Sequence, residues 1–503
     1  MLEYCTPEEA GISSAAILKY LRLLEKAQLS THSIVMIRHG KIFYENYWKP
    51  FHKDFLHRMY SVSKSFAGLA IGFALQDGLI DLDAPITAYL DYSLTEHALP
   101  NMKKQTIRNM LMMCTGVPSV KGLWFDRHPE DRLQDYFNGS LPIVPGSSKT
   151  PGTIFAYDTA ASIALGAVVA AVTGKPLLDY LREKLFDKIG VSKEAYFLTV
   201  PGGHAYSDSA LMCTTQDLAR TVLFTLNGGK WNGEQLLSED YIRAATSNLV
   251  DTGKLGFALP SAFGYGYQIW RTYHNSIFFN GMGSQFGIGV PDQNIVFVIN
   301  SDNQGHPHPH CIIIDRFFEE IVETASDVPL PEDPATYTQL MAYSEQCSLF
   351  ALKDGIADSA LHTVQQSVNG REYILQANPM GITSMKFTFG ETCRLEYTNA
   401  QGAKALSFGM EHNVFGKFPE ENCPSSIGNV PTPGYRYDCA ASARWTHERS
   451  LAILVQFIDV YMGRIFIRVN FREDNGITVM MEKAAHGVQI PYEGVAEGSF
   501  REL

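Results

Sequence analysis

The residues whose types and spacing could do chemistry lie at 59–66, which read Met-Tyr-Ser-Val-Ser-Lys-Ser-Phe. A serine hydroxyl is a poor nucleophile until a base takes its proton. A lysine three residues later on a helix lies one turn away on the same face, within reach of the hydroxyl. Ser61 and Lys64 have this spacing, and no other serine in the chain does. The pair indicates nucleophilic catalysis, and an ordinary N-cap serine followed by a solvated lysine is the alternative.

The pair opens a predicted helix over residues 61–75, which is apolar, rich in small residues and ended by Asp77-Gly78. At a helix amino terminus the positive end of the dipole disfavours a protonated lysine. The free N–H of Ser61 can also donate to an oxyanion there. A strand pair over 33–37 and 41–44, turned by His39-Gly40, precedes this helix.

The other elements of the first two thirds of the chain mix helical and strand patterns. Helices are predicted over 12–29, 106–113, 159–173, 176–186, 215–226 and 311–324, and short apolar strands over 265–271, 276–279, 286–290 and 294–300. This order predicts an α+β domain over residues 1–326. It would consist of one antiparallel sheet flanked by helices, with an all-helical insertion as a subdomain.

A change of composition divides the chain. Residues 327–336 contain Val-Pro-Leu-Pro-Glu-Asp-Pro, which predicts a proline-rich, acidic linker. Residues 337–503 lack long helical patterns. They carry alternating runs at 372–376, 384–389, 394–397, 451–457, 464–469 and 477–482. The second domain is therefore predicted to be all-β, either a sandwich or a small barrel.

Residues 5–325 resemble the serine β-lactamase-like superfamily, which includes class C β-lactamases, penicillin-binding proteins and the peptidase S12 esterases and amidases. Beyond the Ser61 motif, the resemblance rests on these blocks, in order: QDGLIDLDAPI (76–86), TIRNMLMMCTG (106–116), FAY (155–157), SALMCTTQDLAR (209–220) and GYGYQIW (264–270). It implies a β-lactamase-like domain that works through an acyl-enzyme, with its active site between the sheet and the helical subdomain.

The resemblance also implies roles for further residues. Tyr157 would pass the proton between Ser61 and the leaving group. The family's third motif, Lys-Thr-Gly or His-x-Gly on a strand, falls at Phe279-Asn280-Gly281, with its register open by one residue. Gly281 would let the backbone approach the substrate closely. The Met282 N–H would then be the second oxyanion donor, beside that of Ser61.

Two positions depart from the family's pattern. Thr159 stands where lactamases have the asparagine of Tyr-x-Asn, and a threonine offers only a hydroxyl. Phe279 stands where a cation recognises the β-lactam carboxylate, and a phenyl ring cannot pair with an anion. Both changes disfavour a dedicated β-lactamase or a transpeptidase. Trp124 and Trp270 are candidates to line an acyl or leaving-group pocket, with core packing as the alternative.

Composition excludes several other classes of protein. The 503 residues are 45% hydrophobic, and Lys+Arg 41 against Asp+Glu 53 gives a net charge of −12. No basic field exists to bind nucleic acid or anionic lipid. We expect no membrane span, a cytoplasmic location without a signal peptide, and eight reduced cysteines because no CxxC pair occurs. The histidines at 306, 308 and 310 alternate with prolines, which favours a loop over a metal site.

The sequence therefore predicts a serine hydrolase that needs no metal or cofactor and cleaves a carboxylic ester in a small molecule or an acylated polymer. Two alternatives stay open. One is an amidase or a D-amino-acid peptidase. The other is a non-catalytic scaffold whose C-terminal β-domain binds a glycan, a peptide or a second copy of the chain, and a homo-oligomer is compatible with each of these interpretations.

Overall fold

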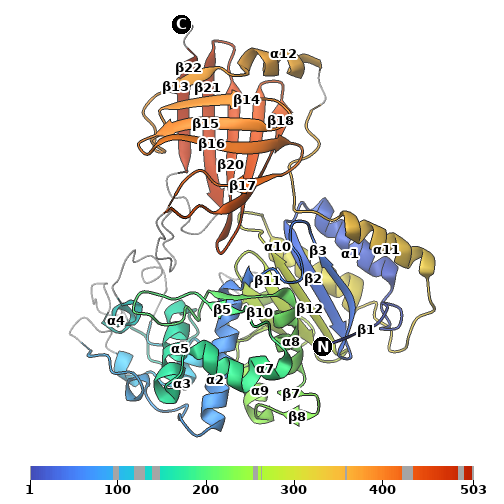
Figure 1. The fold of residues 1–503 in the computed structure, drawn as a ribbon. Coiled ribbons are helices and arrows are strands. Elements are labelled where there is room, and N and C mark those ends of the chain that lie inside the picture. The colour runs from blue at the N-terminus through green and yellow to red at the C-terminus, as the bar shows by residue number, and fades with distance from the viewer. Residues whose placement is uncertain are drawn as a thin grey trace. The chain divides into compact units, whose positions relative to one another are not determined.

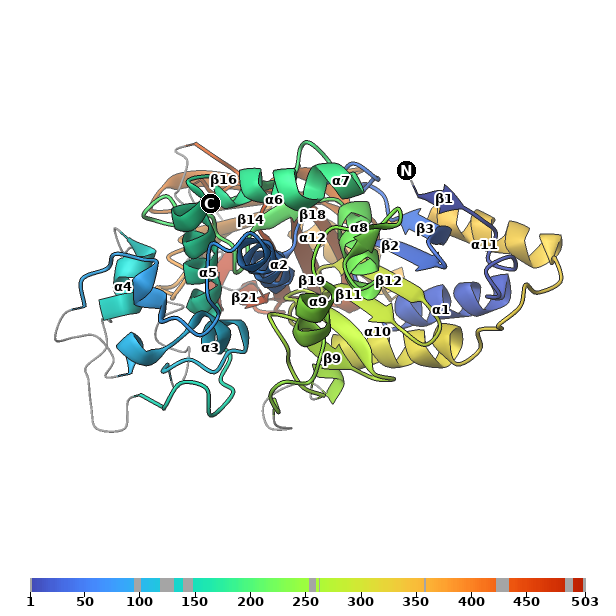
Figure 2. The same ribbon diagram turned by 90° about the horizontal axis from the view of Figure 1, so that it is seen from below.

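The computed structural model describes residues 2–94, 101–117, 131–138, 148–252, 259–261, 263–356, 359–421, 434–484 and 492–500. The chain divides into two units, Met1–Ser348 and Leu349–Leu503. Both are drawn in Figure 1 and, turned by 90°, in Figure 2. Each unit has its own sheet and its own apolar core.

The first unit is built on a seven-stranded sheet with the order β1-β3-β2-β12-β11-β10-β9. Its strands are β1 Glu3–Tyr4, β2 Thr31–Arg38, β3 Lys41–Tyr47, β9 Trp270–Thr272, β10 Ser276–Gly281, β11 Gln285–Val290 and β12 Ile295–Ser301. Neighbours are antiparallel except for the short β1–β3 pair. Because β2 pairs with β12, strands from the two ends of the unit meet at its centre. The predicted antiparallel sheet is confirmed.

Helices cover both faces of this sheet, and every residue of β2 and β12 is buried. On one face lie α1 (Ser14–Lys26) and α10 (Pro309–Phe317), which share a core with Phe297 of β12. On the other face α8 (Thr215–Leu226) packs against β2, β11 and β12, as Figure 2 shows. A Cβ at Gly287 of β11 would lie 2.7 Å from Val222 of α8, so this close packing requires glycine.

A largely helical region joins β3 to β9. Its elements are β4 His57–Arg58, η1 Tyr60–Val62, α2 Ser63–Gln76, η2 Ile86–Ala88, η3 Met102–Lys104, α3 Ile107–Leu111, α4 Arg132–Asn138, α5 Thr159–Thr173, α6 Leu177–Leu181, η4 Arg182–Phe186, α7 Asp187–Ile189, β5 Tyr196–Phe197, β6 Leu211–Cys213, β7 Lys230–Trp231, β8 Glu234–Gln235, α9 Glu239–Ala245 and η5 Leu259–Ser261. The helices α2 and α5 pack on each other, and small residues on both allow the close approach. In the described residues no single helix is long and apolar enough to span a membrane; α5 and the segment Leu177–Ile189 qualify only as a pair bent by 77°.

Several element boundaries differ from the sequence-based expectation. The predicted strand over 265–271 shortens to β9, because Gln268 has a φ of 59° and turns the chain before Trp270. The helix expected over 61–75 begins as the 3₁₀ turn η1 and continues as α2. The closing helix expected over 311–324 starts earlier, as α10, and ends in the π-helical segment η6 (Phe318–Val322).

The division between the units falls after Ser348, whereas the sequence placed a linker at 327–336 and the all-β domain at 337–503. The difference is the helix α11 (Pro334–Gln346), which packs against α1 of the first unit. Leu340 of α11 is fully buried, and the Ser344 hydroxyl lies 2.9 Å from the Tyr44 hydroxyl of β3. These contacts place α11 in the first unit.

The second unit is a closed β-barrel. Its elements are α12 Ser359–Val368, β13 Glu372–Leu375, β14 Ser384–Thr388, β15 Cys393–Asn399, β16 Gly402–Met410, β17 Val414–Lys417, β18 Asp438–His447, β19 Ser450–Ile458, β20 Met462–Phe471, β21 Gly476–Ala484 and β22 Gly494–Phe500. The described strands follow the order β16-β15-β14-β13-β22-β21-β20-β19-β18, and a parallel β16–β18 pair closes the ring of nine. The barrel alternative of the sequence-based prediction is therefore correct.

Apolar side chains fill the barrel, among them the buried rings of Trp445 and Phe471. A polar cluster lies inside as well. The Glu420 carboxylate accepts hydrogen bonds from the hydroxyls of Tyr397 and Tyr492 and from the amide of Asn399, and it pairs with Lys404 at 3.5 Å. These three hydrogen bonds and the ion pair compensate the buried carboxylate, as burial of a charge requires.

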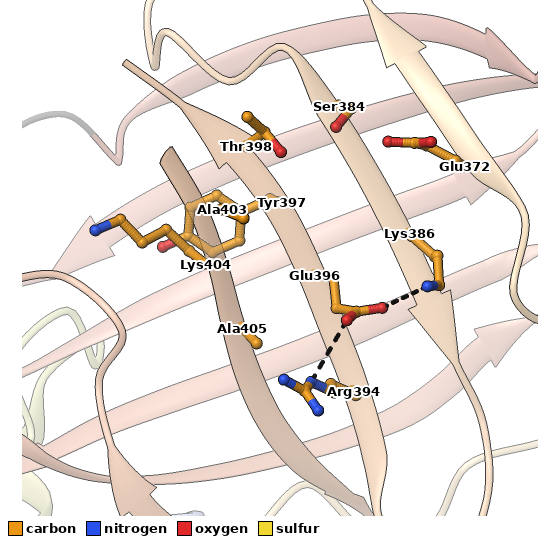
Figure 3. Close-up of a pocket in the computed structure, with 10 residues that line it drawn as sticks. All are labelled: Glu372, Ser384, Lys386, Arg394, Glu396, Tyr397, Thr398, Ala403, Lys404 and Ala405. Atoms are coloured by element: carbon orange, nitrogen blue, oxygen red, sulfur yellow. Dashed lines mark ion pairs between the residues drawn. The ribbon is translucent and has the colours of Figure 1, made fainter. Parts of the chain in front are cut away.

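A hollow of about 320 Å³ lies over β13–β16 of the barrel (Figure 3). Small side chains at Ser384 and Ala403 leave the space. The Glu396 carboxylate at its edge pairs with the Lys386 ammonium at 2.8 Å, and the Arg394 guanidinium lies 3.8 Å from it (Figure 3). Of the three cations that line this hollow, Lys386 and Arg394 are thus partly neutralised by Glu396, and Lys404 pairs with Glu420.

Gln268 joins three helices of the first unit. Its backbone carbonyl accepts from the Ser65 hydroxyl of α2 at 2.7 Å, and its side-chain carbonyl accepts from the Ser162 hydroxyl of α5 at 2.6 Å. Its amide donates to the carbonyls of Met110 and Leu111 of α3, both at 3.0 Å. Because Gln268 is only 1% exposed, water cannot replace these bonds.

The variant Gln268→Ala should be strongly destabilised. It leaves the buried Ser162 hydroxyl without its acceptor, and an unsatisfied buried group costs about 1–3 kcal/mol. It also removes the two side-chain bonds to α3, where the Met110 and Leu111 carbonyls keep only backbone donors. We expect the free energy of unfolding to fall by about 2–4 kcal/mol in urea denaturation. The control Gln134→Ala, at an exposed position of α4, should change it by less than about 0.5 kcal/mol. Equal effects of the two variants would contradict this role.

Candidate active site

Ser61 and Lys64 are brought together at the junction of η1 and α2. The Lys64 ammonium donates to the Ser61 hydroxyl at 3.0 Å and to the backbone carbonyl of Asp208 at 2.5 Å. Lys64 is 1% exposed, whereas Ser61 is half-buried. Ser61 is therefore partly exposed, while its hydroxyl contacts a buried amine.

The turn that precedes Ser61 has an uncommon backbone conformation. Tyr60 has a φ of 45°, in the left-handed region that a bulky residue rarely adopts. The Arg58 guanidinium lies 5.0 Å from the centre of the Tyr60 ring, and its Nε donates to the Ser209 carbonyl at 3.0 Å. The backbone N–H of Met59 donates to the Leu211 carbonyl at 2.9 Å. These contacts hold the strained turn and with it the position of Ser61.

The Tyr157 ring lies beside Lys64. Its centre is 5.2 Å from the Lys64 ammonium, and the ring also stacks on Trp270 with a separation of 5.6 Å between the ring centres. Trp270 is 5% exposed and also contacts Phe155 and Tyr265. Trp270, which the sequence suggested as a pocket residue, thus packs against the Tyr157 ring, and Trp124 lies outside the described residues.

Asp158 anchors the segment that carries Tyr157 and Thr159. Its side chain caps the amino terminus of α5 and accepts from Thr115 at 2.7 Å and from Tyr136 at 3.0 Å. Burial raises the pKa of the Asp158 carboxyl. Thr159, the first residue of α5, is 6% exposed, and its hydroxyl makes no hydrogen bond within the described part of the chain.

The strand β10 brings the third motif to the nucleophile. A Cβ at Gly281 would lie 2.5 Å from the Met59 carbonyl, so only glycine allows β10 to pack against the turn before Ser61. Asn280 is half-buried, and its amide donates to the Ser261 hydroxyl at 3.0 Å. Phe279 is fully buried opposite Gly287 of β11. Its ring is therefore a core side chain, and it offers no surface to a substrate in this conformation.

Met282 lies in the tight turn between β10 and β11. The buried Gln285 amide donates to the Met282 carbonyl at 3.3 Å and also to the Ser301 carbonyl. Ser284, with a φ of 72°, completes the turn. The bond to the Met282 carbonyl holds the peptide between Met282 and Gly283. The role of the Met282 N–H, in the preceding peptide, as an oxyanion donor stays a prediction.

Comparison with known proteins identifies the family. The model of the beta-lactamase family matches residues 21–315, which is more than half of the chain. The chain belongs to the beta-lactamase family. Members of this family are serine hydrolases that include amidases and esterases.

Individual relatives are distant. The 6-aminohexanoate-dimer hydrolase of Paenarthrobacter ureafaciens is 24% identical over 310 residues, which cover 58% of this chain and 76% of that protein. A putative beta-lactamase from Bacteroides dorei superposes with a TM-score of 0.50 at 18% identity, over 60% of this chain and 96% of that one. An octameric penicillin-binding protein homologue from Pyrococcus abyssi gives a TM-score of 0.48 at 14% identity, over 96% of this chain and 99% of that one.

Asp208 is the site residue to which sequence reasoning gave no role. Its carbonyl is one of the two acceptors of Lys64, and its side chain is 1% exposed. Burial raises the pKa of its carboxyl to about 6, against the opposing effect of the Lys64, Arg132 and Arg58 charges. The one signal in the sequence was its place directly before the block 209–220 that resembles the family.

The histidines at 306–310 do not gather around a common point. The His306 Nε2 lies 2.8 Å from the Ala27 carbonyl, and His310 packs against the ring of Phe286. Burial lowers the pKa of His310 to about 4. Among the described residues, no three His, Cys, Asp or Glu side chains are placed to share a metal ion.

The variant Tyr157→Phe removes the hydroxyl of Tyr157 and keeps its ring. The ring can still stack on Trp270 and face Lys64, so the thermal unfolding temperature should not change. Loss of a proton-transfer group typically lowers a rate about 10²–10⁴-fold, and we expect kcat/KM on a p-nitrophenyl ester to fall by that factor. The control Tyr343→Phe, whose hydroxyl donates to Glu25 between α11 and α1, should keep full activity. Full activity of Tyr157→Phe would remove Tyr157 from the proton path.

Proposed function

We propose that this protein is a serine hydrolase that forms an acyl-enzyme on Ser61 and acts on carboxylic esters. The observation that carries the proposal is the 3.0 Å hydrogen bond between the buried Lys64 ammonium and the Ser61 hydroxyl. A buried lysine with the nucleophile as a direct partner can exchange a proton with it during attack. Membership of the beta-lactamase family supports the same assignment.

The proposed reaction has two halves. In the first, Ser61 Oγ attacks the acyl carbon and gives its proton to Lys64 in its neutral amine form, while the N–H groups of Ser61 and Met282 stabilise the oxyanion. The bond from the acyl carbon to the leaving-group oxygen then breaks, and Tyr157 passes the proton to that oxygen. In the second, water attacks the acyl-enzyme, its proton returns along the same path to Ser61, and the carboxylic acid leaves.

Two residues favour esters over amides. Thr159 replaces an amide side chain that could bind a substrate amide, and its buried hydroxyl is a smaller polar group. Phe279 supplies no cation for a substrate carboxylate. Amide hydrolysis is the second candidate because the relative from Paenarthrobacter ureafaciens is named for hydrolysing the 6-aminohexanoate dimer.

The test compares p-nitrophenyl esters, from acetate to octanoate, with p-nitroanilides of the same acyl groups. We expect ester turnover by the wild-type protein to fall at least about 10³-fold in Ser61→Ala. The matched control is Ser238→Ala, since the Ser238 side chain makes no capping hydrogen bond and lies before α9. Anilide turnover as fast as that of the matched ester would replace the esterase by an amidase.

If none of these substrates is turned over, covalent labelling would distinguish a hydrolase with another substrate from a protein without a reactive serine. A fluorophosphonate reacts with an activated serine without any need for the natural acyl group. Labelling that is lost in Ser61→Ala would keep the hydrolase and exclude only the substrates tried. No Ser61-dependent labelling would contradict the proposal and favour a scaffold that works through the barrel unit.

A further inference from the structure

A groove of about 380 Å³ lies at the edge of the sheet of the first unit, beside β1, β3 and α11. Figure 2 shows these three elements next to one another. Residues 4–6 and 9 line the groove, together with residues 42–45 of β3 and with Tyr337 and Met341 of α11. Its volume is within the range of about 300–1,000 Å³ that ligand sites occupy. None of these lining residues belongs to the candidate active site, so the groove is a separate feature of the unit.

The edge of β3 at this groove is only partly covered. β1 pairs in parallel with Lys41 and Ile42, and the Cys5 N–H donates to the Ile42 carbonyl at 3.0 Å. In the described part of the chain, no strand pairs with residues 43–47 on this side of β3. A free strand edge presents backbone N–H and C=O groups, so it can accept an extended peptide as an additional strand.

The aromatic and apolar side chains of the groove are exposed. Tyr4 is 61% exposed, and Met341 and Tyr337 of α11 are 38% and 36% exposed. The helix that carries the last two is held in place, because the Ser344 carbonyl accepts from the Asn46 amide of β3 at 3.2 Å. A tyrosine ring can pack on the stem of a long side chain and attract a cation over its face. These walls suit a segment that carries both apolar and cationic residues.

Two carboxylates give the groove a negative charge. Glu9 accepts from the Thr6 N–H at 2.8 Å, and the half-buried Glu45 accepts from the Gln216 amide at 2.8 Å. Neither carboxylate forms an ion pair with a cation of the described residues, and the neighbouring Lys41 pairs with another glutamate at 3.2 Å. Neutral donors leave the charge of a carboxylate in place. Both carboxylates are thus available to a cationic ligand.

We propose that this groove binds an extended basic segment of a partner protein, which adds to β3 as an edge strand and places a lysine or arginine side chain against Glu9 and Glu45. The free edge of β3 selects an extended backbone, and the carboxylates select a cation. A small organic cation would use the carboxylates and leave the strand edge empty. Because side chains of a strand alternate between its two faces, cationic residues at alternate positions would lie on one face.

The experiment measures the binding of fluorescent pentapeptides to the full chain by anisotropy. The set has Arg, Lys, Glu or Ser at the second and fourth positions and Val, Phe or Ser at the other three. We expect only the peptides with Arg or Lys to bind, with an affinity that falls as the salt concentration rises. A central proline removes a backbone N–H and should abolish this binding. Binding without a preference for charge, equal binding of the proline peptides, or no binding by any peptide would overturn the proposal.

The double variant Glu9→Gln/Glu45→Gln tests the carboxylates. Glutamine keeps an oxygen that can accept from Thr6 or Gln216, so the local structure should be retained. We expect the double variant to bind the basic peptides about tenfold more weakly and to lose most of the salt dependence. The control Glu194→Gln removes an exposed carboxylate of the first unit that does not line the groove, and it should bind as the wild type does. Equal affinities of the double variant and the wild type would contradict the role of the two carboxylates.

Cys5 reports the position of a bound peptide independently of its affinity. Its thiol is partly exposed and lines the groove. A saturating basic peptide should slow the alkylation of Cys5 by iodoacetamide at least about fivefold, as measured by peptide mass analysis. Cys311 of α10 is also partly exposed and serves as the internal control, with an unchanged rate. If Cys5 is not protected, or if both thiols are protected equally, the peptide binds elsewhere and the proposal is wrong.

A further variant keeps the test decisive if the double variant does not fold. Tyr337→Ala removes an exposed ring of α11 and should weaken the binding of basic peptides about threefold. Wild-type affinity in this variant would contradict the groove as the binding site. Because no residue of the candidate active site lines the groove, labelling of Ser61 by a fluorophosphonate should be the same in all of these variants. Failure of this proposal would therefore leave the proposed function standing.

Discussion

The buried ammonium of Lys64 is the constraint around which the first unit is organised. A charge that is 1% exposed must be met by acceptors. Lys64 finds them in the Ser61 hydroxyl, the Asp208 carbonyl and the face of the Tyr157 ring. These groups come from three separate stretches of the chain, so the lysine ties together the start of α2, the approach to α5 and the turn that precedes β6.

The rest of the unit supplies the rigidity that such a site needs. The Gln268 side chain and backbone bind α2, α3 and α5 to one another. The close approach of Gly281 to Met59 holds the end of β10 against the turn before Ser61. The Gln285 amide holds the Met282 carbonyl that follows. Ser61 is consequently placed by helix packing on one side and by the edge of a sheet on the other. This is the arrangement that allows preorganised donors to act on a developing charge.

Those site residues that belong to short sequence motifs could be predicted from the sequence. The spacing of Ser61 and Lys64 is a property of one helix turn, and Tyr157 lies in a short block that resembles the family. The contacts of Asp208 and Gln268 could not be predicted, because their partners are far away along the chain. Burial of Phe279 depends on α8 and β11, which no local pattern at 276–279 encodes.

In the fold, too, features set by local sequence could be predicted and features set by long-range contacts could not. Short apolar runs predict the strands of the first unit, and alternating apolar residues predict those of the second. Closure of the barrel depends on the parallel pairing of β16 with β18, a long-range choice without a sequence signature. The sequence predicts a linker at 327–336 and an all-β domain from 337, because proline and acidic residues mark a break there, and it gives no helix at 334–346. In the structure these residues form α11, which Leu340 and Ser344 pack against the first unit.

The most direct test of this account is the identification of the acylated residue. The protein would be mixed with a p-nitrophenyl ester, quenched in acid within the first turnovers and digested for peptide mass analysis. The account predicts one acyl group, on Ser61, whose formation is lost in Lys64→Ala. An acyl group on another residue, or ester turnover that persists without Ser61, would contradict it.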